Sequence, residues 1–407
     1  MNLLQHLRMG RVQFNSPEHS QLDHCLCVPL SRIDDLNLSM WGGIFRSDGS
    51  FVSASGLINN GREVVGPGDG TLPAASKKLK GHSLYLGVCH YHYGHFLVET
   101  LSRIWGMTKA DLAAYDHILL LPLNGSVPIF VWDLFRALGV IERVKVVSEP
   151  LSLETVTIPS PAIEYPQRVH RQIANLHLLF DNIPADQQSD QPLFLSRTDL
   201  VPGHHRVVVG EAKLERALAN QGVRIFHPQH HPVMVQAAVL RKHRTIISFA
   251  GSALHTLMLT GGGHRVVAYS ARKAPAVFPL IDLALGNRAT YISAARTTLK
   301  GLSRMPVGFH PEIIDPRPVL RSLKHAGIIQ RFDLGDYGTP EADASEVRRY
   351  NTALIMRQAL EVSQREGDKV CHAEVAAYLQ ENELDTDMIS QGCRSSELML
   401  RFFHGIY

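Results

Sequence analysis

Hydrophobic residues in the first 75 positions come in short runs that are separated by turn residues. Gly42-Gly43, Asn59-Asn60-Gly61 and Gly66-Pro67-Gly68-Asp69-Gly70 are typical turn signals. The segment Cys25-Leu26-Cys27 fits within one of the strands between them. This part of the chain therefore predicts short strands joined by tight turns.

From about residue 83 the pattern changes to apolar runs that alternate with longer amphipathic segments. Short continuous apolar runs are typical of strands covered on both faces. Gly139 is placed to end the helix expected over 128–138. The expected strands and helices are 83–89, 94–107 (helix), 117–121, 128–138 (helix), 144–147 and 155–158. This order predicts a first α/β unit with a parallel sheet.

A polar linker over residues 182–191 precedes a second unit of the same kind. Strands and helices alternate through it, and Gly261-Gly262-Gly263 forms the last turn. The expected elements are 193–196, 211–220 (helix), 223–226, 232–243 (helix), 245–249, 252–260 (helix) and 265–269. Two such units would face each other across a cleft at the carboxyl ends of their strands.

The remaining chain begins with four prolines between Pro306 and Pro318, which favour a boundary. Helical patterns follow over 341–366, 372–380 and 395–403, and their apolar spacing indicates packing against the body of the protein. The fold class is thus α/β, with domains over residues 1–182, 190–305 and 306–407. The last of these is a linker and helical extension.

Composition and charge exclude several classes of protein. The 407 residues carry 41 basic and 38 acidic side chains, a net charge of +3, which is too mild and too dispersed for a nucleic-acid partner. An apolar stretch of about 18 residues is missing, so we expect no membrane-spanning segment. The first residues do not resemble a secretory signal. Five scattered cysteines form no disulfide framework or zinc site, which favours the cytoplasm, with peripheral association at the inner membrane left open.

The segment from Cys89 to Trp105 concentrates polar chemistry in apolar surroundings. In a helix, His95, Glu99 and Arg103 lie at i, i+4 and i+8 and share one face. Unpaired charge is costly to bury, so this stripe must be paired or used. Two interpretations stay open: a Glu99–Arg103 pair capped by His95, or a functional site.

The second unit offers groups that suit an anion. Arg197 directly follows the strand 193–196, and a loop with His204, His205 and Arg206 comes soon after. Gly251-Ser252 follows another strand and opens a helix, whose free backbone N–H groups can bind an anion. Guanidinium groups match the oxygens of a diphosphate.

Together these residues resemble glycosyltransferase family 61 over about residues 83–270. The family motif has a histidine, a glutamate four residues later and an arginine four after that, followed much later by a strand ending in Ser-Arg, a second arginine, a glutamine on a helix and a Gly-Ala/Ser turn. In this chain the matching residues are His95, Glu99, Arg103, Ser196-Arg197, Arg206, Gln236 and Gly251-Ser252. The chain departs from the family at His92, Phe96 and Ala250, where asparagine, tryptophan and histidine are frequent.

The resemblance implies a GT-B-like architecture of two Rossmann-like domains facing a cleft, with the second domain holding the donor nucleotide. It implies an inverting, metal-independent hexosyl- or pentosyltransferase that needs no cofactor. The donor would be a nucleotide sugar, most often a UDP-sugar, and the acceptor a glycan or lipid-linked glycan. Family members without a signal anchor act in bacterial surface-polysaccharide biosynthesis.

Each matching residue then has an expected role. His95 or Glu99 would take the proton of the acceptor hydroxyl, with His92 and Arg103 in support. Arg197, Arg206, Gly251 and Ser252 would bind the departing diphosphate. Gln236 would contact the nucleotide or diphosphate, or serve as a buried capping amide.

Two other functions remain open. His90 and His92 point the same way on a strand and, with Glu99, resemble the metal ligands of cupins, although the spacing to Glu99 is longer and the α/β pattern differs from a cupin barrel. A non-catalytic nucleotide-sugar-binding protein is favoured by Ala250 in the position of the family histidine.

Overall fold

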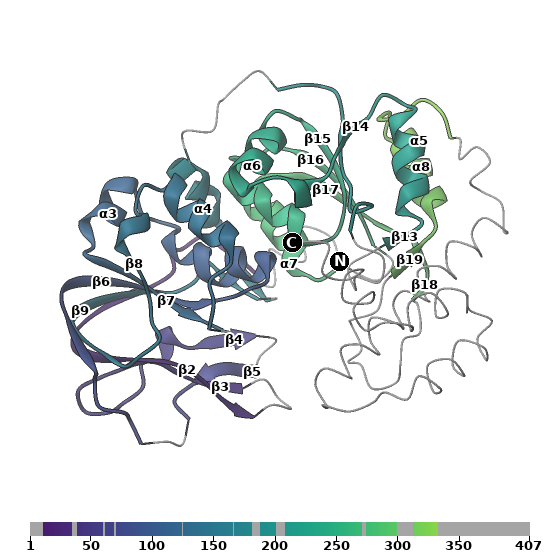
Figure 1. Ribbon diagram of the computed structural model, residues 1–407. Helices are drawn as coiled ribbons and strands as arrows, with labels where there is room; N and C mark the ends of the chain where they lie inside the picture. Colours follow the sequence, from purple (N-terminus) through teal and green to yellow (C-terminus); the bar gives the residue numbers. More distant parts are fainter. Residues whose placement is uncertain are drawn as a thin grey trace, which may run out of the picture.

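The computed structural model describes residues 11–34, 39–59, 62–68, 71–123, 125–165, 167–180, 188–200, 208–270, 274–298 and 312–332. The helices expected over 341–366, 372–380 and 395–403 lie outside these residues. Within them the chain forms two α/β units, which Figure 1 shows side by side. The α/β class is therefore confirmed. Of the described helices, none is both long and apolar enough to cross a lipid bilayer.

The first unit is built on an eight-stranded sheet. Its strands, in spatial order, are β4 (Leu57–Asn59), β5 (Arg62–Gly66), β3 (Ser39–Phe45), β2 (His19–Asp34), β9 (Leu151–Pro159), β6 (Lys77–Cys89), β7 (His117–Pro122) and β8 (Val144–Val146). The strands β9, β6, β7 and β8 are parallel, whereas β2 runs antiparallel to β3 and β9. The predicted parallel pairing of the strands after residue 83 is confirmed, and the strands before residue 75 join the same sheet and make it mixed.

Side chains on the two faces of the parallel strands belong to two separate hydrophobic cores in this unit. Leu84 and Leu86 pack with the helices on one face, and Tyr85 packs with Cys25 and Cys27 on the other. Successive side chains of a strand point to opposite faces, so one strand serves two cores. The strand predicted at Cys25–Cys27 is confirmed, but β2 is far longer than the short strands expected there.

Most helices of the first unit come after the parallel strands β6 and β7, whereas η1 (Ser53–Ser55) follows β3 and η5 (Arg171–Phe180) follows β11 (Arg168–His170). The other helices are α2 (Tyr93–His95), η2 (Phe96–Thr100), η3 (Leu101–Ile104), α3 (Lys109–Ala114), α4 (Ile129–Ala137) and η4 (Ile141–Arg143). Gly139 ends α4 with a φ of 74°, as predicted, since glycine adopts this left-handed conformation readily. A small sheet of β1 (Val12–Gln13), β11 and β10 (Ile163–Glu164) completes the unit.

The second unit has a fully parallel five-stranded sheet. Its strands, in spatial order, are β14 (Arg224–Phe226), β12 (Leu193–Leu195), β15 (Thr245–Phe249), β16 (Arg265–Ser270) and β17 (Arg288–Ser293). In chain order this is 2-1-3-4-5, a doubly wound arrangement. The order reverses between β12 and β15, and ligands of such sheets bind at the carboxyl ends of the strands at that point.

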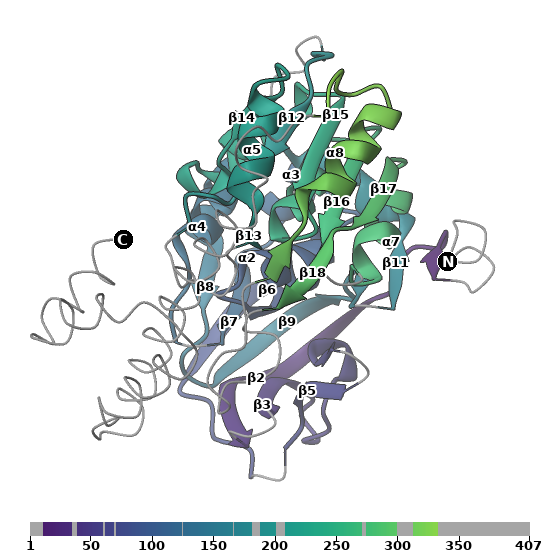
Figure 2. The same cartoon turned by 90° about the vertical axis from the view of Figure 1, so that its right-hand side faces the viewer.

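Helices cover both faces of this sheet. Those on the face toward the first unit are η6 (Pro228–His230), α6 (Val233–Arg241), η7 (Ser252–Leu259) and α7 (Val277–Ala284). On the outer face, α5 (Glu211–Ala219) lies beside α8 (Pro316–His325), as Figure 2 shows. The proline-rich segment thus contains a helix of the second unit, because Pro316 stands in its first turn and Val319 and Leu323 enter the core.

A third, short sheet of β13 (Val208–Val209), β19 (Glu312–Ile314) and β18 (Ala295–Thr298) ties α8 to the second unit. The two units share one hydrophobic core between them. Leu120 and Leu134 of the first unit belong to the same buried cluster as Leu195 and Leu257 of the second. This shared core sets the position of the strand ends that border the site.

Candidate active site

A cavity of about 1040 Å³ lies between the two units. His92 and His95 line it from the first unit, and Arg197, Gly251 and Ser252 line it from the second. Residues that are between about 100 and 160 positions apart in the sequence therefore meet in one space. The second-unit residues follow β12 and β15, the two strands at which the sheet order reverses.

On the first-unit side, the carboxylate of Glu99 lies against two imidazoles. Its Oε2 is 2.7 Å from Nε2 of His90 and 3.2 Å from Nδ1 of His95. The two rings stack with centroids 5.2 Å apart. These are ion-pair distances. Glu99 and His90 are buried, whereas the side chain of His95 is 32% exposed and opens to the cavity.

The electrostatics of this cluster favour an ionised Glu99. Burial opposes ionisation, but the contacts with His90 and His95 and their positive charge outweigh it and lower the pKa of Glu99 to about 2. A carboxylate with so low a pKa is a weak base near neutral pH. It is instead suited to orient an imidazole and to stabilise its protonated form.

The helical segment that carries these residues is not a regular α-helix. One α-helical turn, α2, leads into the π-helical η2 and then into η3, a 3₁₀-helix. A π-helical turn inside a helix is rare and frequently marks a functional site. The single helix predicted over 94–107 is thus correct in position but not in winding.

Arg103 has a different environment from the one predicted by its spacing. It is buried, and its Nη1 donates hydrogen bonds to the carbonyl oxygens of Pro159, at 2.5 Å, and Ala54, at 3.1 Å. The guanidinium therefore ties η3 to η1 and to the end of β9. Of the two interpretations of the stripe, a Glu99–Arg103 pair capped by His95 does not describe the site, since the carboxylate of Glu99 contacts two imidazoles.

His92 caps the first helical turn. Its Nδ1 accepts a hydrogen bond from the backbone N–H of His95 at 3.5 Å, and its ring meets the His95 ring edge-on at 5.1 Å. Because β6 ends at Cys89, the segment from His90 to His92 is not the strand that this metal set requires. The metal set of His90, His92 and Glu99 is therefore wrong.

A different set could hold a metal ion. Ligand atoms of His90, His95 and Glu99 lie within 4.8 Å of one another. Two imidazole nitrogens and one carboxylate oxygen suit several transition metals. The same contacts also describe a carboxylate that orients two imidazoles.

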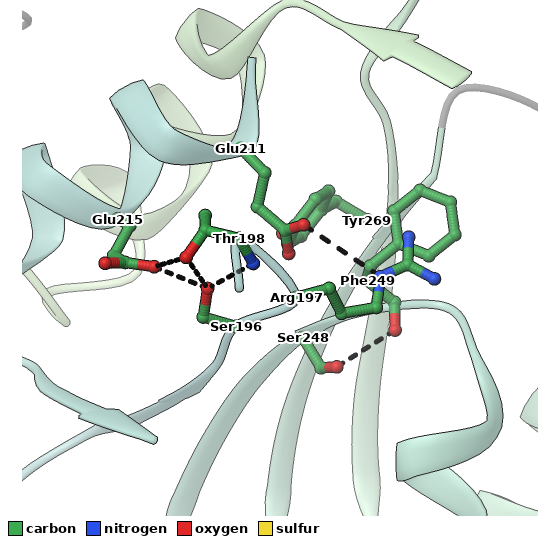
Figure 3. Close-up of polar contacts among 8 residues, drawn as sticks. All are labelled: Ser196, Arg197, Thr198, Glu211, Glu215, Ser248, Phe249 and Tyr269. Atoms are coloured by element: carbon green, nitrogen blue, oxygen red, sulfur yellow. Dashed lines mark hydrogen bonds and ion pairs between the residues drawn. The ribbon is translucent and has the colours of Figure 1, made fainter. Parts of the chain in front are cut away.

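On the second-unit side, Arg197 extends from the end of β12 into the cavity. Its guanidinium lies over the ring of Phe249, 3.8 Å from the ring centroid, and its Nε is 3.9 Å from Oε2 of Glu211 (Figure 3). Glu211 is fully buried and accepts a hydrogen bond from the hydroxyl of Tyr269 at 2.7 Å. Burial raises the pKa of Glu211, and the charge of Arg197 acts in the opposite direction. The aromatic ring and the carboxylate thus fix the base of a guanidinium whose outer edge faces the cavity.

Ser196 fixes the strand end from which Arg197 departs. Its hydroxyl donates to Oε2 of Glu215 at 2.5 Å, and the hydroxyl of Thr198 donates to the same oxygen at 2.6 Å (Figure 3). These bonds anchor the strand end to α5. The side chain of Arg197 therefore leaves from a rigid point.

The turn after β15 lies directly beside Arg197. A Cβ at Gly251 would be only 3.3 Å from Nη1 of Arg197, so the glycine allows this approach. Ser252 begins η7, and the backbone N–H of Ala250 donates to the carbonyl of Tyr269 at 2.8 Å. The guanidinium and the start of a helix thus lie side by side, and both favour a bound anion.

Of the two remaining candidate residues, the structure describes Gln236 but not Arg206. Gln236 lines the cavity, but its side-chain N–H groups donate to the carbonyls of Pro228, at 2.9 Å, and His231, at 2.8 Å. The amide therefore holds the loop around η6, which corresponds to the capping role. Arg206 lies outside the described residues.

The two sides of the cavity touch at α2 and η7. A Cβ at Gly94 would lie 3.0 Å from both Oγ of Ser252 and Cδ2 of His255. The hydroxyls of Tyr93 and Thr256 are hydrogen-bonded at 2.9 Å. The imidazole–carboxylate cluster and the anion-binding turn therefore have a fixed relation to each other.

Comparison with known protein families identifies the segment that contains these site residues. Residues 93–267 match the family model described as Glycosyltransferase 61. This part of the chain belongs to glycosyltransferase family 61. Among curated proteins, none matches the chain.

The glycosyltransferase 61 segment spans both sides of the cavity. It begins at α2, before His95 and Glu99, and ends within β16, after Arg197 and Gly251. Two residues at the site were missing from the expected roles. The sequence indicates His90 only as a metal ligand, and it does not indicate His255, which follows Ser252 by three residues.

Proposed function

We propose that this glycosyltransferase moves a sugar from a nucleotide-sugar donor, a UDP-sugar, to a hydroxyl group of a glycan or lipid-linked glycan. The proposal includes a GT-B-like arrangement, inversion at the sugar carbon and independence from metal ions. One observation carries it: Arg197 and the Gly251–Ser252 turn line the same cavity as His95 with its buried partner Glu99.

The donor diphosphate is assigned to the second-unit side. Arg197 and the backbone N–H groups at the start of η7 offer positive charge and hydrogen-bond donors to phosphate oxygens. Arg206 is a further candidate from the sequence, while Gln236 contributes by holding the loop around η6. These groups would stabilise the negative charge that develops on the leaving nucleoside diphosphate.

The base is assigned to His95. Its imidazole takes the proton of the acceptor hydroxyl, the oxygen attacks the anomeric carbon from the face opposite the diphosphate, and the bond from that carbon to the phosphate oxygen breaks. Glu99 remains ionised and stabilises the protonated imidazole. His90 holds Glu99 from the other side, and His92 and Arg103 fix the helical segment.

A binding protein without transferase activity is the second candidate, because Ala250 replaces the family histidine at the anion-binding turn. Such a protein would bind a nucleotide sugar without releasing free nucleotide in the presence of any acceptor. The two candidates differ in a measurable way. The transferase would transfer sugar to surface polysaccharide and release the nucleotide, whereas the binding protein would do neither.

A thermal-shift screen against UDP, GDP, CMP and dTDP and the sugars of each tests the donor class. We expect the largest rise in melting temperature with UDP and UDP-sugars. A protein that responds to none of these nucleotides would contradict the proposal.

A further inference from the structure

His255 is a third imidazole in the cavity and comes from the second unit. It follows Ser252 by three residues in η7, and residues at i and i+3 of a 3₁₀-helix lie on the same side. The residue is only 5% exposed, yet it lines the cavity together with His95 and Arg197. None of the roles proposed above uses it.

The His255 ring is held in one orientation. It stacks parallel to the ring of Phe278, with centroids 4.7 Å apart and an interplanar angle of 5°. The Cδ2 atom lies 3.0 Å from the position of a Cβ at Gly94, so this edge of the ring faces α2. Because Cδ2 is bonded to Nε2, the same edge carries Nε2. Nδ1 lies on the other edge, buried and without a hydrogen-bond partner among the described residues.

The ring is neutral under all ordinary conditions. Burial, reinforced by the positive charges of His95 and His92, lowers the pKa of His255 to about 3. A neutral imidazole carries one N–H donor and one acceptor nitrogen. A buried donor without a partner is rarer in proteins than a buried acceptor without one. The preferred tautomer therefore has its proton on Nε2, at the edge that faces α2.

The position of His255 indicates which group could accept a hydrogen bond from Nε2–H. A sugar attacked with the help of His95 and bonded to a diphosphate at Ser252 must lie between these two residues. His255 lies beside Gly94, the neighbour of His95, and on the same helix as Ser252. Phosphate oxygens are served by the charged Arg197, whereas a neutral donor suits a hydroxyl group.

We propose that Nε2–H of His255 donates a hydrogen bond to a hydroxyl group of the sugar being transferred. His255 is thus a donor-specificity residue that distinguishes a nucleotide sugar from the free nucleotide. This inference rests on the proposed function.

The test compares three substitutions at residue 255 by isothermal titration calorimetry. The probes are UDP with UDP-glucose and UDP-N-acetylglucosamine, GDP with GDP-mannose, and dTDP with dTDP-glucose. His255→Leu removes both nitrogens, His255→Asn is too short to place an N–H at the Nε2 position, and His255→Gln can place one there. The matched control is His264→Gln, a buried imidazole of the same unit that is bonded to the hydroxyl of Thr260 at 2.8 Å, away from the cavity.

We expect His255→Leu and His255→Asn to weaken binding of the sugar nucleotide about tenfold, the effect of losing one hydrogen bond at its upper range. Binding of the free nucleoside diphosphate stays within about twofold, and His255→Gln recovers most of the preference for the sugar nucleotide. His264→Gln leaves the ratio of the two affinities unchanged. Melting temperatures identify any variant that does not fold. If His255→Leu does not fold, the comparison of affinities relies on His255→Asn.

Each contrary result has its own meaning. If the affinity ratio is unchanged in both variants, the role of His255 is wrong and the proposed donor class stands. Equal loss of the free nucleotide and the sugar nucleotide assigns the contact to phosphate and also overturns the inference. Failure of the unmodified protein to bind any probe overturns the proposed donor class and this inference together.

Discussion

Histidine side chains in the cavity differ in their surroundings, and the differences assign their chemistry. His95 is partly exposed and contacts a carboxylate, whereas His255 is buried between Phe278 and Gly94, with no carboxylate beside it among the described residues. The first environment places an ionised carboxylate beside the imidazole that we assign as the base, and the second keeps an imidazole neutral. The sequence pattern identified the first, through Glu99 four residues later, but the ring that stacks on His255 is more than twenty positions away.

The low pKa of His255 predicts a pH-dependent stability. The pKa is about 3 in the folded protein and 6.5 in an unfolded chain, so the unfolded state binds the proton first as the pH falls. Its stability contribution is complete above pH 6.5 and is lost progressively toward pH 3. Between pH 7 and pH 5 the unmodified protein should lose about 2 kcal/mol more than His255→Gln, at about 1.4 kcal/mol per pH unit.

Urea unfolding of both proteins at pH 7 and pH 5 measures this difference. Since the other titrating groups are common to both, the comparison isolates residue 255. Equal losses for the two proteins would mean that the buried ring takes up a proton without cost in the folded state.

The cluster of His90, His95 and Glu99 supports a second prediction at this scale, because it could also hold a metal ion. If Glu99 orients His95 as a base, sugar transfer is unchanged after treatment with EDTA and removal of the chelator. Loss of transfer that is restored by Mn²⁺ or Zn²⁺, together with metal in the purified protein by mass spectrometry, would assign the cluster to a metal.

At the scale of elements, four strands of the second sheet were predictable because each is a short apolar run followed by a turn, whereas β17 was not predicted because its residues are mostly polar and exposed or half-buried. The strand β15 was predicted with its observed bounds, Thr245–Phe249, and the ends of β12 and β14 were predicted within one residue. The long β2 could not be predicted, since its pairing with β9, more than one hundred residues later, decides its length. The same holds for the winding of η2 and η3, where Arg103 bonds to the carbonyls of Ala54 in η1 and Pro159 in β9, about fifty residues away in each direction.

Close contact between α2 and η7 predicts different effects at two glycines. Gly94→Val places methyl groups against Ser252 and His255, where even a Cβ would lie at 3.0 Å. The substitution should separate the two elements and lower transfer at least tenfold, a cost of about 1.4 kcal/mol or more in the barrier. The matched control is Gly106→Val, because nothing lies within 4 Å of a Cβ at Gly106.

Steady-state rates and melting temperatures of both variants check this prediction. Gly106→Val should retain the rate of the unmodified protein. If Gly94→Val also retains it, the distance between α2 and η7 has no influence on the reaction.

At the scale of the whole molecule, the account depends on two units that share a core and border one cavity. Sequence reasoning predicted that His95 and Arg197 would face each other, because loops of such sheets emerge at the carboxyl ends of the strands. It could not predict that Glu211 and Phe249 would fix Arg197, nor that His90 would contact Glu99, since these contacts depend on how the loops fold.

The division of work between the two units is tested most directly by calorimetric binding of UDP to Arg197→Ala and His95→Ala, together with their rates of sugar transfer. Arg197→Ala should bind UDP about one hundred times more weakly, from the loss of about 3 kcal/mol of charged hydrogen bonds, and transfer no sugar. His95→Ala should bind UDP as the unmodified protein does, yet lose at least a hundredfold in transfer rate. Unchanged UDP binding and transfer in a folded Arg197→Ala variant would contradict the account.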